Sequence, residues 1–263
     1  MMLTRRLIVC LDVQGGRVVK GTRFASLRDV GDPLELAEFY EREGADEITF
    51  LDISASMEDR GTLLDVVRRT AERLFIPLTV GGGVRSASEM AQVLRAGADK
   101  VSVNSSAVKN PDMLEECAER FGSQCVVSSI DAKLCQADGR VRWEVYTHGG
   151  SRRTGLDAVE WAAECARRGA GEILLTSIDG DGARTGYDIA LTRAVSEVVT
   201  VPVIASGGAG NGGHVRDVLL NGGADAALVA GILHDGLTTV GAIKAELDVA
   251  GLPVRYAPER VAP

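Results

Sequence analysis

The chain has 263 residues, of which 45% are hydrophobic and only 4% aromatic, and its formal net charge at pH 7 is −8. The acidic balance and the absence of long basic clusters exclude a typical nucleic-acid-binding protein. The apolar runs are only as long as strands, so we expect no transmembrane helix and no membrane partner. The amino-terminal segment lacks a small-residue cleavage site, and we therefore expect no signal peptide.

The cysteines and histidines show no spacing that is typical of disulfides or metal sites. The chain has five cysteines and three histidines, namely Cys10, Cys117, Cys125, Cys135, Cys165, His148, His214 and His234. This pattern predicts reduced thiols in a cytoplasmic enzyme that uses neither a metal nor another cofactor.

Apolar, β-branched runs alternate with amphipathic stretches along the whole chain. The runs predict eight strands, at 7–13, 47–53, 77–82, 100–104, 125–132, 172–179, 202–208 and 226–232. The amphipathic stretches predict eight helices, at 33–43, 61–74, 87–96, 111–121, 157–168, 188–199, 212–221 and 238–250. Eight strand–helix alternations favour a single (β/α)8 TIM barrel domain over residues 1–263. An open doubly wound sheet is the alternative, but no GxGxxG motif follows the first strand.

Two connections are longer than ordinary loops of a barrel. Residues 14–32 follow the first predicted strand, and residues 133–156 follow the fifth and contain RVRWEVY, a possible hairpin strand. Long connections after strands usually serve a site, and in TIM barrels such sites lie at the carboxyl ends of the strands.

An internal repeat relates the second half of the chain to the first. Residues 79–108 and 204–233 each contain an apolar run, a glycine turn, a helical stretch, the triplet Gly-Ala-Asp and a second apolar run. This repeat predicts a strand–helix unit duplicated into two half-barrels.

Aspartates follow several predicted strands. Asp12 ends the first strand and Asp131 the fifth, which lie diametrically opposite in an eight-stranded ring. Two carboxyl groups that face each other across the mouth suit general acid–base catalysis; alternatively, each caps its loop or pairs with a nearby lysine. Asp52 after the second strand, and Asp181 after the sixth, are expected to contact substrate hydroxyls or to position loops.

Glycine turns follow the third and seventh predicted strands, at 81–83 and 206–208. Glycine lets backbone N–H groups approach an anion, and a following helix adds positive potential. The two opposed turns predict a substrate with a phosphate at each end, although tight turns that only need positive φ remain an alternative. The candidate phosphate residues are Gly83, Asn104, Ser105, Gly182, Ser206, Gly207, Gly208, Ala230 and Gly231.

Charged residues stand at the beginnings of four predicted strands, which lie on the opposite face. These residues are Arg6, Glu47, Lys100 and Glu172. They are consistent either with a salt-bridged plug that stabilises the barrel or with a gate or docking surface.

Taken together, these motifs resemble the cyclase subunit of imidazole glycerol phosphate synthase, from histidine biosynthesis. The resemblance covers almost the whole chain, and its main stretches are IVCLDVQGGRVVKGTRF (8–24), FLDISAS (50–56), TVGGGVRS (79–86), GADKVSVNSSAV (97–108), FGSQCVVSSIDAK (121–133), GAGEILLTSIDGDG (169–182) and IASGGAG (204–210). It implies a glutaminase partner on the amino-terminal face, which supplies ammonia through the barrel.

The resemblance also implies roles for individual residues. Asp12 and Asp131 match the acid–base pair, the four charged residues match a gate for ammonia, and Lys20 is expected to steer or cover the substrate. The implied substrate is the phosphoribulosyl-formimino derivative of aminoimidazole carboxamide ribotide, which carries two phosphates. Gly180 replaces a frequent arginine and Gly231 a common serine, so one phosphate site departs from the family pattern.

Two alternatives remain open at this point. The isomerase of the same pathway shares the half-barrel symmetry, two phosphate sites and two aspartates. A non-catalytic regulatory subunit that binds a bisphosphate is the alternative from another class of protein. The segment VVKGTRF and the charged ring favour the cyclase over the isomerase, and the paired aspartates argue against a silent subunit.

Overall fold

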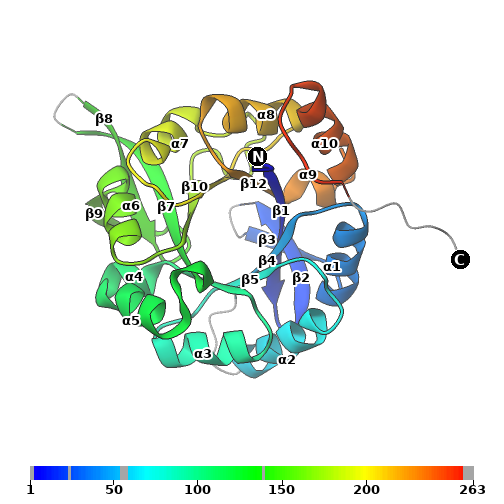
Figure 1. The fold of residues 1–263 in the computed structure, drawn as a ribbon, viewed down its shortest axis with the longest axis horizontal. Coiled ribbons are helices and arrows are strands. Elements are labelled where there is room, and N and C mark those ends of the chain that lie inside the picture. The colour runs from blue at the N-terminus through cyan, green and yellow to red at the C-terminus, as the bar shows by residue number, and fades with distance from the viewer. Residues whose placement is uncertain (1–2, 23–24, 54–58, 138–139, 257–263) are drawn as a thin grey trace, which may run out of the picture.

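The computed structural model describes residues 3–22, 25–53, 59–137 and 140–256, and it contains a closed barrel of eight parallel strands (Figure 1). Around the ring, the order is β1, β4, β5, β6, β7, β10, β11 and β12, and pairing of β12 with β1 and of β7 with β10 completes it. The strands are β1 (Arg6–Gln14), β4 (Glu47–Asp52), β5 (Leu78–Gly81), β6 (Lys100–Val103), β7 (Val126–Ala137), β10 (Glu172–Ser177), β11 (Val203–Ser206) and β12 (Ala226–Val229).

The described residues form eight longer helices, and these surround the strands (Figure 1). They are α1 (Pro33–Arg42), α2 (Asp59–Ala71), α3 (Ala87–Arg95), α5 (Asp112–Phe121), α6 (Ala158–Arg167), α7 (Ile189–Ser196), α8 (Gly212–Asn221) and α10 (Val240–Val249). Each overlaps a predicted helix and each barrel strand a predicted strand, so the (β/α)8 TIM barrel is confirmed.

Most of these helices begin at a polar side chain that accepts hydrogen bonds from the first backbone N–H groups. Such caps satisfy donors that lack a partner within the helix, and each contributes about 1 kcal/mol. The capping residues are Asp32, Ser86, Asp157, Asp188, Asn211 and Thr239.

The core has two layers, separated by the barrel wall. A large cluster fills the space between strands and helices, and a smaller cluster lies inside the barrel. Successive side chains of a strand point to opposite faces, and this explains the two clusters. In β1, Leu7 and Val9 belong to the outer cluster, while Ile8 and Cys10 belong to the inner one. The inner cluster consists of Ile8, Cys10, Val127, Leu174, Ile204, Ala226 and Leu228.

A four-fold repeat marks the amino-terminal ends of alternate strands. The segments GADE (44–47), GADK (97–100), GAGE (169–172) and GADA (223–226) each lead into β4, β6, β10 or β12. Their glycines have φ of 95°, 115°, 100° and 72°, and each ends the preceding helix, where a left-handed residue is common.

The aspartate of this repeat joins neighbouring strands. Asp99 Oδ2 accepts from the backbone N–H of Leu78 at 2.8 Å, and the N–H of Asp99 donates to the Leu78 carbonyl at 2.9 Å. Asp46 makes the same two bonds with Leu7, and Asp225 makes them with Val203. The same pair of hydrogen bonds therefore joins neighbouring strands at three places at the amino-terminal end of the barrel.

The two long connections contain more regular structure than the sequence indicates. Within the first connection, β2 (Arg17–Thr22) and β3 (Ala25–Gly31) pair antiparallel, and the second connection contains β8 (Arg140–Thr147) and β9 (Arg152–Asp157), which also pair antiparallel. The hairpin of β7 and β8 extends beyond the ring of helices (Figure 1). The hairpin strand expected at RVRWEVY is confirmed as β8, whereas β9 and the prolonged end of β7 were not expected.

Candidate active site

Asp12 and Asp131 lie at the carboxyl ends of opposite strands of the barrel. Four steps around the ring separate β1 from β7 in either direction. Side chains two or four residues apart in a strand point to the same face. Asp12 is two residues beyond Cys10, and Asp131 is four residues beyond Val127; Cys10 and Val127 both lie inside the barrel. Both carboxyl groups therefore face the mouth of the barrel from opposite sides.

Burial changes the proton affinity of both groups. It raises the pKa of Asp12 from 3.8 to about 6, with a further increase from the charge of Asp181 and a decrease from the Cys10 hydrogen bond. Burial also raises the pKa of Asp131 to about 6, and the hydrogen bond from Asn104 opposes this increase. Each carboxyl group can then either donate or accept a proton near neutral pH, as acid–base catalysis requires.

Asp181 is the third carboxylate of the mouth. It lies in the turn after β10, where its N–H donates to the Ser177 carbonyl at 3.0 Å. Its charge acts on both Asp12 and Asp131, so it lies near both. Asp179, two residues earlier, accepts from the N–H of Leu134 at 2.8 Å and thereby ties this turn to the prolonged part of β7.

Asn104 orients Asp131. Its Nδ2 donates to Asp131 Oδ2 at 2.9 Å. Its Oδ1 is buried and has no hydrogen-bond partner among the described residues. Because a buried acceptor without a partner is costly, this oxygen suits a hydroxyl or N–H donor of a bound molecule.

The ends of β6 and β12 differ from the expected strand ends. Ser105 and Gly231 do not end strands but begin two short helices, α4 (Ser105–Lys109) and α9 (Gly231–His234). The residues before them share one backbone conformation, since Asn104 has φ −128° and ψ −89° and Ala230 has φ −135° and ψ −80°. The internal repeat thus extends through these helices, which are too short to show helical periodicity.

Ser105 already has a protein partner, because its hydroxyl oxygen accepts from the N–H of His148 at 3.0 Å. This bond connects α4 to the turn between β8 and β9.

Both glycine turns need glycine for their own geometry. A β-carbon at Gly82 (φ 100°) would lie 2.2 Å from the Asp52 carbonyl oxygen, and one at Gly207 (φ 86°) would lie 2.6 Å from the Ser177 carbonyl oxygen. Each turn therefore packs against the end of the preceding strand. Gly208 packs even more closely, because its β-carbon would lie 2.0 Å from the Gly186 carbonyl oxygen. Gly83 (φ 64°) and Gly182 (φ 71°) share the left-handed region.

Gly180 and Gly231, which the resemblance gave as unusual, lie near the glycine turn after β11 and at the start of α9. A β-carbon at Gly180 would lie 3.0 Å from the Gly207 carbonyl oxygen, so a larger residue there requires a small shift of the turn. A β-carbon at Gly231 would lie 3.6 Å from Lys20 Nζ, which is ordinary contact. Lys20 itself donates to the Gly231 carbonyl oxygen at 3.0 Å and pairs with Asp235; the sequence had not indicated a role for Asp235.

A closed ring of ion pairs occupies the opposite end of the barrel. Lys100 Nζ lies 2.9 Å from carboxylate oxygens of both Glu47 and Glu172, and Arg6 Nη1 lies 3.1 Å from Glu47 and 2.9 Å from Glu172. Thr79 Oγ1 donates to Glu47 at 2.5 Å and was not among the expected residues, because a threonine in a strand carries no functional signal.

The four-fold repeat explains how the ring is assembled. Positions 47, 100, 172 and 226 are equivalent starts of alternate strands, and alternate strands contribute each layer of a TIM barrel interior. The fourth position is Ala226, and Arg6 on the neighbouring strand is its partner in register. Arg6 therefore occupies the space that the small Ala226 leaves.

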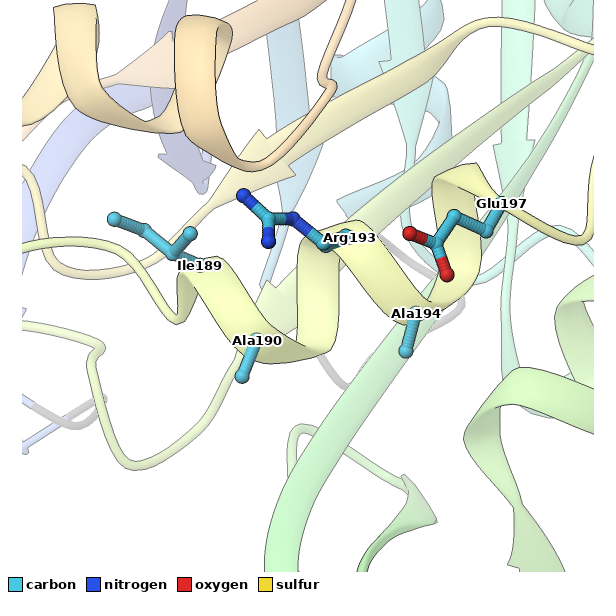
Figure 2. Close-up of a pocket in the computed structure, with 5 residues that line it drawn as sticks. All are labelled: Ile189, Ala190, Arg193, Ala194 and Glu197. Carbon is cyan, nitrogen blue, oxygen red and sulfur yellow. The ribbon is translucent and has the colours of Figure 1, made fainter.

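A surface hollow elsewhere has no connection with these residues. It lies over the outer face of α7 and is lined by Ile189, Ala190, Arg193, Ala194 and Glu197 (Figure 2). Across the described segments, no group of three or more His, Cys, Asp or Glu side chains could hold a metal ion. Within the same segments, no helix has both the length and the apolar character to cross a membrane.

Two comparisons with known proteins identify the family of this chain. The family model described as "Histidine biosynthesis protein" matches residues 6–239. The protein "Imidazole glycerol phosphate synthase subunit HisF" of Myxococcus xanthus (strain DK1622) is 72% identical over 254 residues, which cover 97% of this chain and 99% of that protein. This chain therefore belongs to the histidine biosynthesis protein family.

Proposed function

We propose that the chain is the cyclase subunit of imidazole glycerol phosphate synthase and that the carboxyl ends of its strands carry the chemistry. The 72% identity to a HisF subunit over nearly the whole chain supports the activity. The single structural observation that carries the assignment of the site is the opposed pair Asp12 and Asp131, both with a pKa of about 6.

The proposed reaction needs proton transfer on two sides of the substrate. Ammonia attacks the ribulose ketone and forms an imine with loss of water. Ring closure then gives the imidazole, and the formamidine C–N bond breaks to release aminoimidazole carboxamide ribotide and imidazole glycerol phosphate. Asp131 is assigned as the general acid and Asp12 as the base, and their similar pKa values allow these roles to exchange between steps.

The two glycine corners are assigned to the two phosphates of the substrate. One corner comprises Gly83, Asn104 and Ser105 after β5 and β6. The other comprises the turn at Asp181 and Gly182, the turn at 206–208, and the start of α9 at Ala230 and Gly231. Backbone N–H groups of such turns bind anions without needing a lysine or arginine. Lys20 and Asp52 complete the proposed contacts with the substrate.

The amino-terminal face is assigned to a glutaminase partner. The name of the Myxococcus protein describes a subunit, which supports a complex. The ring of Arg6, Glu47, Lys100 and Glu172 would gate ammonia into the barrel. Phe75 precedes β5 on the same face and is 92% exposed, as expected for an apolar contact with another protein.

Turnover without a partner tests the activity. The purified chain is incubated with the phosphoribulosyl substrate and an ammonium salt, and the products are separated chromatographically. Imidazole glycerol phosphate and aminoimidazole carboxamide ribotide are expected in equal amounts. A second incubation contains the ribosyl isomer, and if the chain converts it into the ribulosyl compound, the isomerase is correct. If neither incubation gives a product, the regulatory subunit is favoured.

A further inference from the structure

Three basic side chains from three separate segments converge on Asp235, just after α9. Arg28 Nη2 lies 2.7 Å from Asp235 Oδ1, and both Lys20 and Arg184 pair with Oδ2. Lys20 belongs to β2, Arg28 to β3, and Arg184 to the connection between β10 and α7. One carboxylate therefore joins the hairpin after β1, the connection after β10 and the helix after β12.

The cluster has a net charge of +2, which is opposite to that of a phosphate monoester near neutral pH. The hydrogen bond from Lys20 is the main cause that holds the pKa of Asp235 below 3.8, so this carboxyl group stays ionised. Arg28 and Arg184 remain 63% and 42% exposed. Each guanidinium has five N–H donors, and an ammonium has three, so donors remain for a second anion.

The position of the cluster links it to the second glycine corner. Lys20 Nζ donates to the Gly231 carbonyl oxygen at 3.0 Å. Arg184 packs against the turn after β11, because a β-carbon at Gly210 would lie 2.2 Å from the Arg184 carbonyl oxygen. Arg184 has φ 57°, a conformation that is uncommon outside glycine and concentrates at functional sites.

The acidic mouth explains why fixed positive charge is useful at this corner. Asp181 lies near both Asp12 and Asp131 at the strand ends, and the charges of these carboxylates oppose the approach of a phosphate. Gly231 brings no hydroxyl group to this corner. Charged donors at the same corner supply stronger bonds to an anion than a neutral hydroxyl does.

We propose that Asp235 is a positioning residue that holds Lys20, Arg28 and Arg184 as one cationic cradle for the substrate phosphate at the β11–β12 corner. Asp235 binds one side of the three cations, and the phosphate binds their remaining donors. The proposal rests on the proposed function, since it names the residues that recognise one end of the bisphosphate. Without Asp235 the three side chains repel one another, and each must be ordered by the substrate itself.

The test compares Asp235→Asn with Asp235→Glu and with Asp65→Asn as a matched control. Asp65 is a surface aspartate on α2 that also pairs with two arginines, Arg68 and Arg69. With saturating ammonium salt, Asp235→Asn is expected to raise KM for the bisphosphate about tenfold and to change kcat less than about threefold. Asp235→Glu restores part of the affinity, and Asp65→Asn leaves both constants unchanged.

This split between KM and kcat separates positioning from a merely structural role. A structural defect would lower the melting temperature and the active fraction, and hence kcat, with KM unchanged. A KM for Asp235→Asn at or below that of the unchanged protein overturns the proposal, because it would mean that Asp235 competes with the phosphate for the three cations.

Titration calorimetry with inorganic phosphate tests the cradle without the substrate. The unchanged protein is expected to bind phosphate, and Asp235→Asn about tenfold more weakly. Equal binding by the two proteins, or no binding by either, overturns the cradle. If phosphate binds as expected but no imidazole product forms with the bisphosphate and ammonia, the proposed function fails instead.

Discussion

Asp12 and Asp131 are stabilised in the neutral form by the folded protein. Their pKa values are about 6 when folded, against 3.8 for an exposed aspartate. The folded state therefore binds these protons more tightly than the unfolded chain does. The resulting stability is fully present below about pH 4 and is lost as the pH rises through about 6, by roughly 3 kcal/mol for each group. At neutral pH both buried carboxyl groups are therefore mostly ionised, at a cost in stability.

Replacing Asp12 with Asn is consequently expected to stabilise the protein at pH 8. The amide has the same shape but never carries the buried charge, so the gain should reach on the order of 1–3 kcal/mol at pH 8 and shrink towards zero at pH 4. Urea unfolding at both pH values measures it. A gain that is equal at the two pH values, or a loss at pH 8, would show that burial does not control this carboxyl group.

Lys244 provides a second test at the scale of single residues. Its side chain is 1% exposed, and Nζ lies 2.7 Å from Asp46 Oδ1. Lys244→Ala leaves Asp46 without its most buried partner, so we expect a loss of roughly 3–5 kcal/mol in the free energy of unfolding. Arg255→Ala, which removes the exposed partner of the same carboxylate, should cost less than about 1 kcal/mol. Denaturant unfolding that gives equal losses would contradict this ranking.

The sequence could identify candidate catalytic residues only where they follow directly on a predicted strand, because strand ends meet at the mouth of the barrel. Asp12 and Asp131 could be found because each ends an apolar run. Asp235 could not, because its partners Lys20, Arg28 and Arg184 come from distant parts of the chain and no local pattern marks their convergence.

The repeated segments show how a short element can fix the architecture. Each GAD or GAG segment ends a helix with a left-handed glycine, and three of the four supply an aspartate that joins two strands. Gly97 also packs tightly, because a β-carbon there would lie 2.5 Å from the Ala71 β-carbon. The glycine is thus required by both backbone and packing.

Gly97→Ala is expected to cost clearly more than Gly251→Ala. Both glycines have positive φ, 115° and 76°, but a β-carbon at Gly251 has no described atom within 4 Å. Gly251→Ala should cost about 1 kcal/mol for the backbone alone, and Gly97→Ala should exceed 2 kcal/mol because α2 and α3 must also move apart. Thermal unfolding of the two variants measures the difference, and equal melting temperatures would contradict it.

Elements with strong periodicity could be predicted from the sequence, and short or exposed ones could not. The eight strands and eight long helices of the barrel show clear apolar patterns. In contrast, α4 and α9 are five and four residues long, less than the length over which a helical pattern appears. The strands β2, β3 and β9 lie outside the barrel, so they lack the continuous apolar runs of buried strands. The exposed strand β8 is the exception, because the alternation in RVRWEVY indicates it.

At the scale of the whole molecule, the two ends of the barrel carry different electrostatics. The amino-terminal end is closed by a ring of alternating charges in which each cation contacts two carboxylates. The carboxyl end holds buried carboxyl groups with raised pKa values and the cluster around Asp235. This difference supports the proposed assignment of ammonia and the partner to the amino-terminal end and of proton transfer to the carboxyl end.

The most direct test of the central claim is turnover by Asp131→Asn with ammonium salt as the nitrogen source. Asp131→Asn keeps the shape of the side chain but removes the proton that the reaction needs. We expect kcat to fall by about 10²–10⁴ while the protein stays folded and KM changes little. A kcat within about threefold of the unchanged protein would contradict the assignment of Asp12 and Asp131 as the acid–base pair.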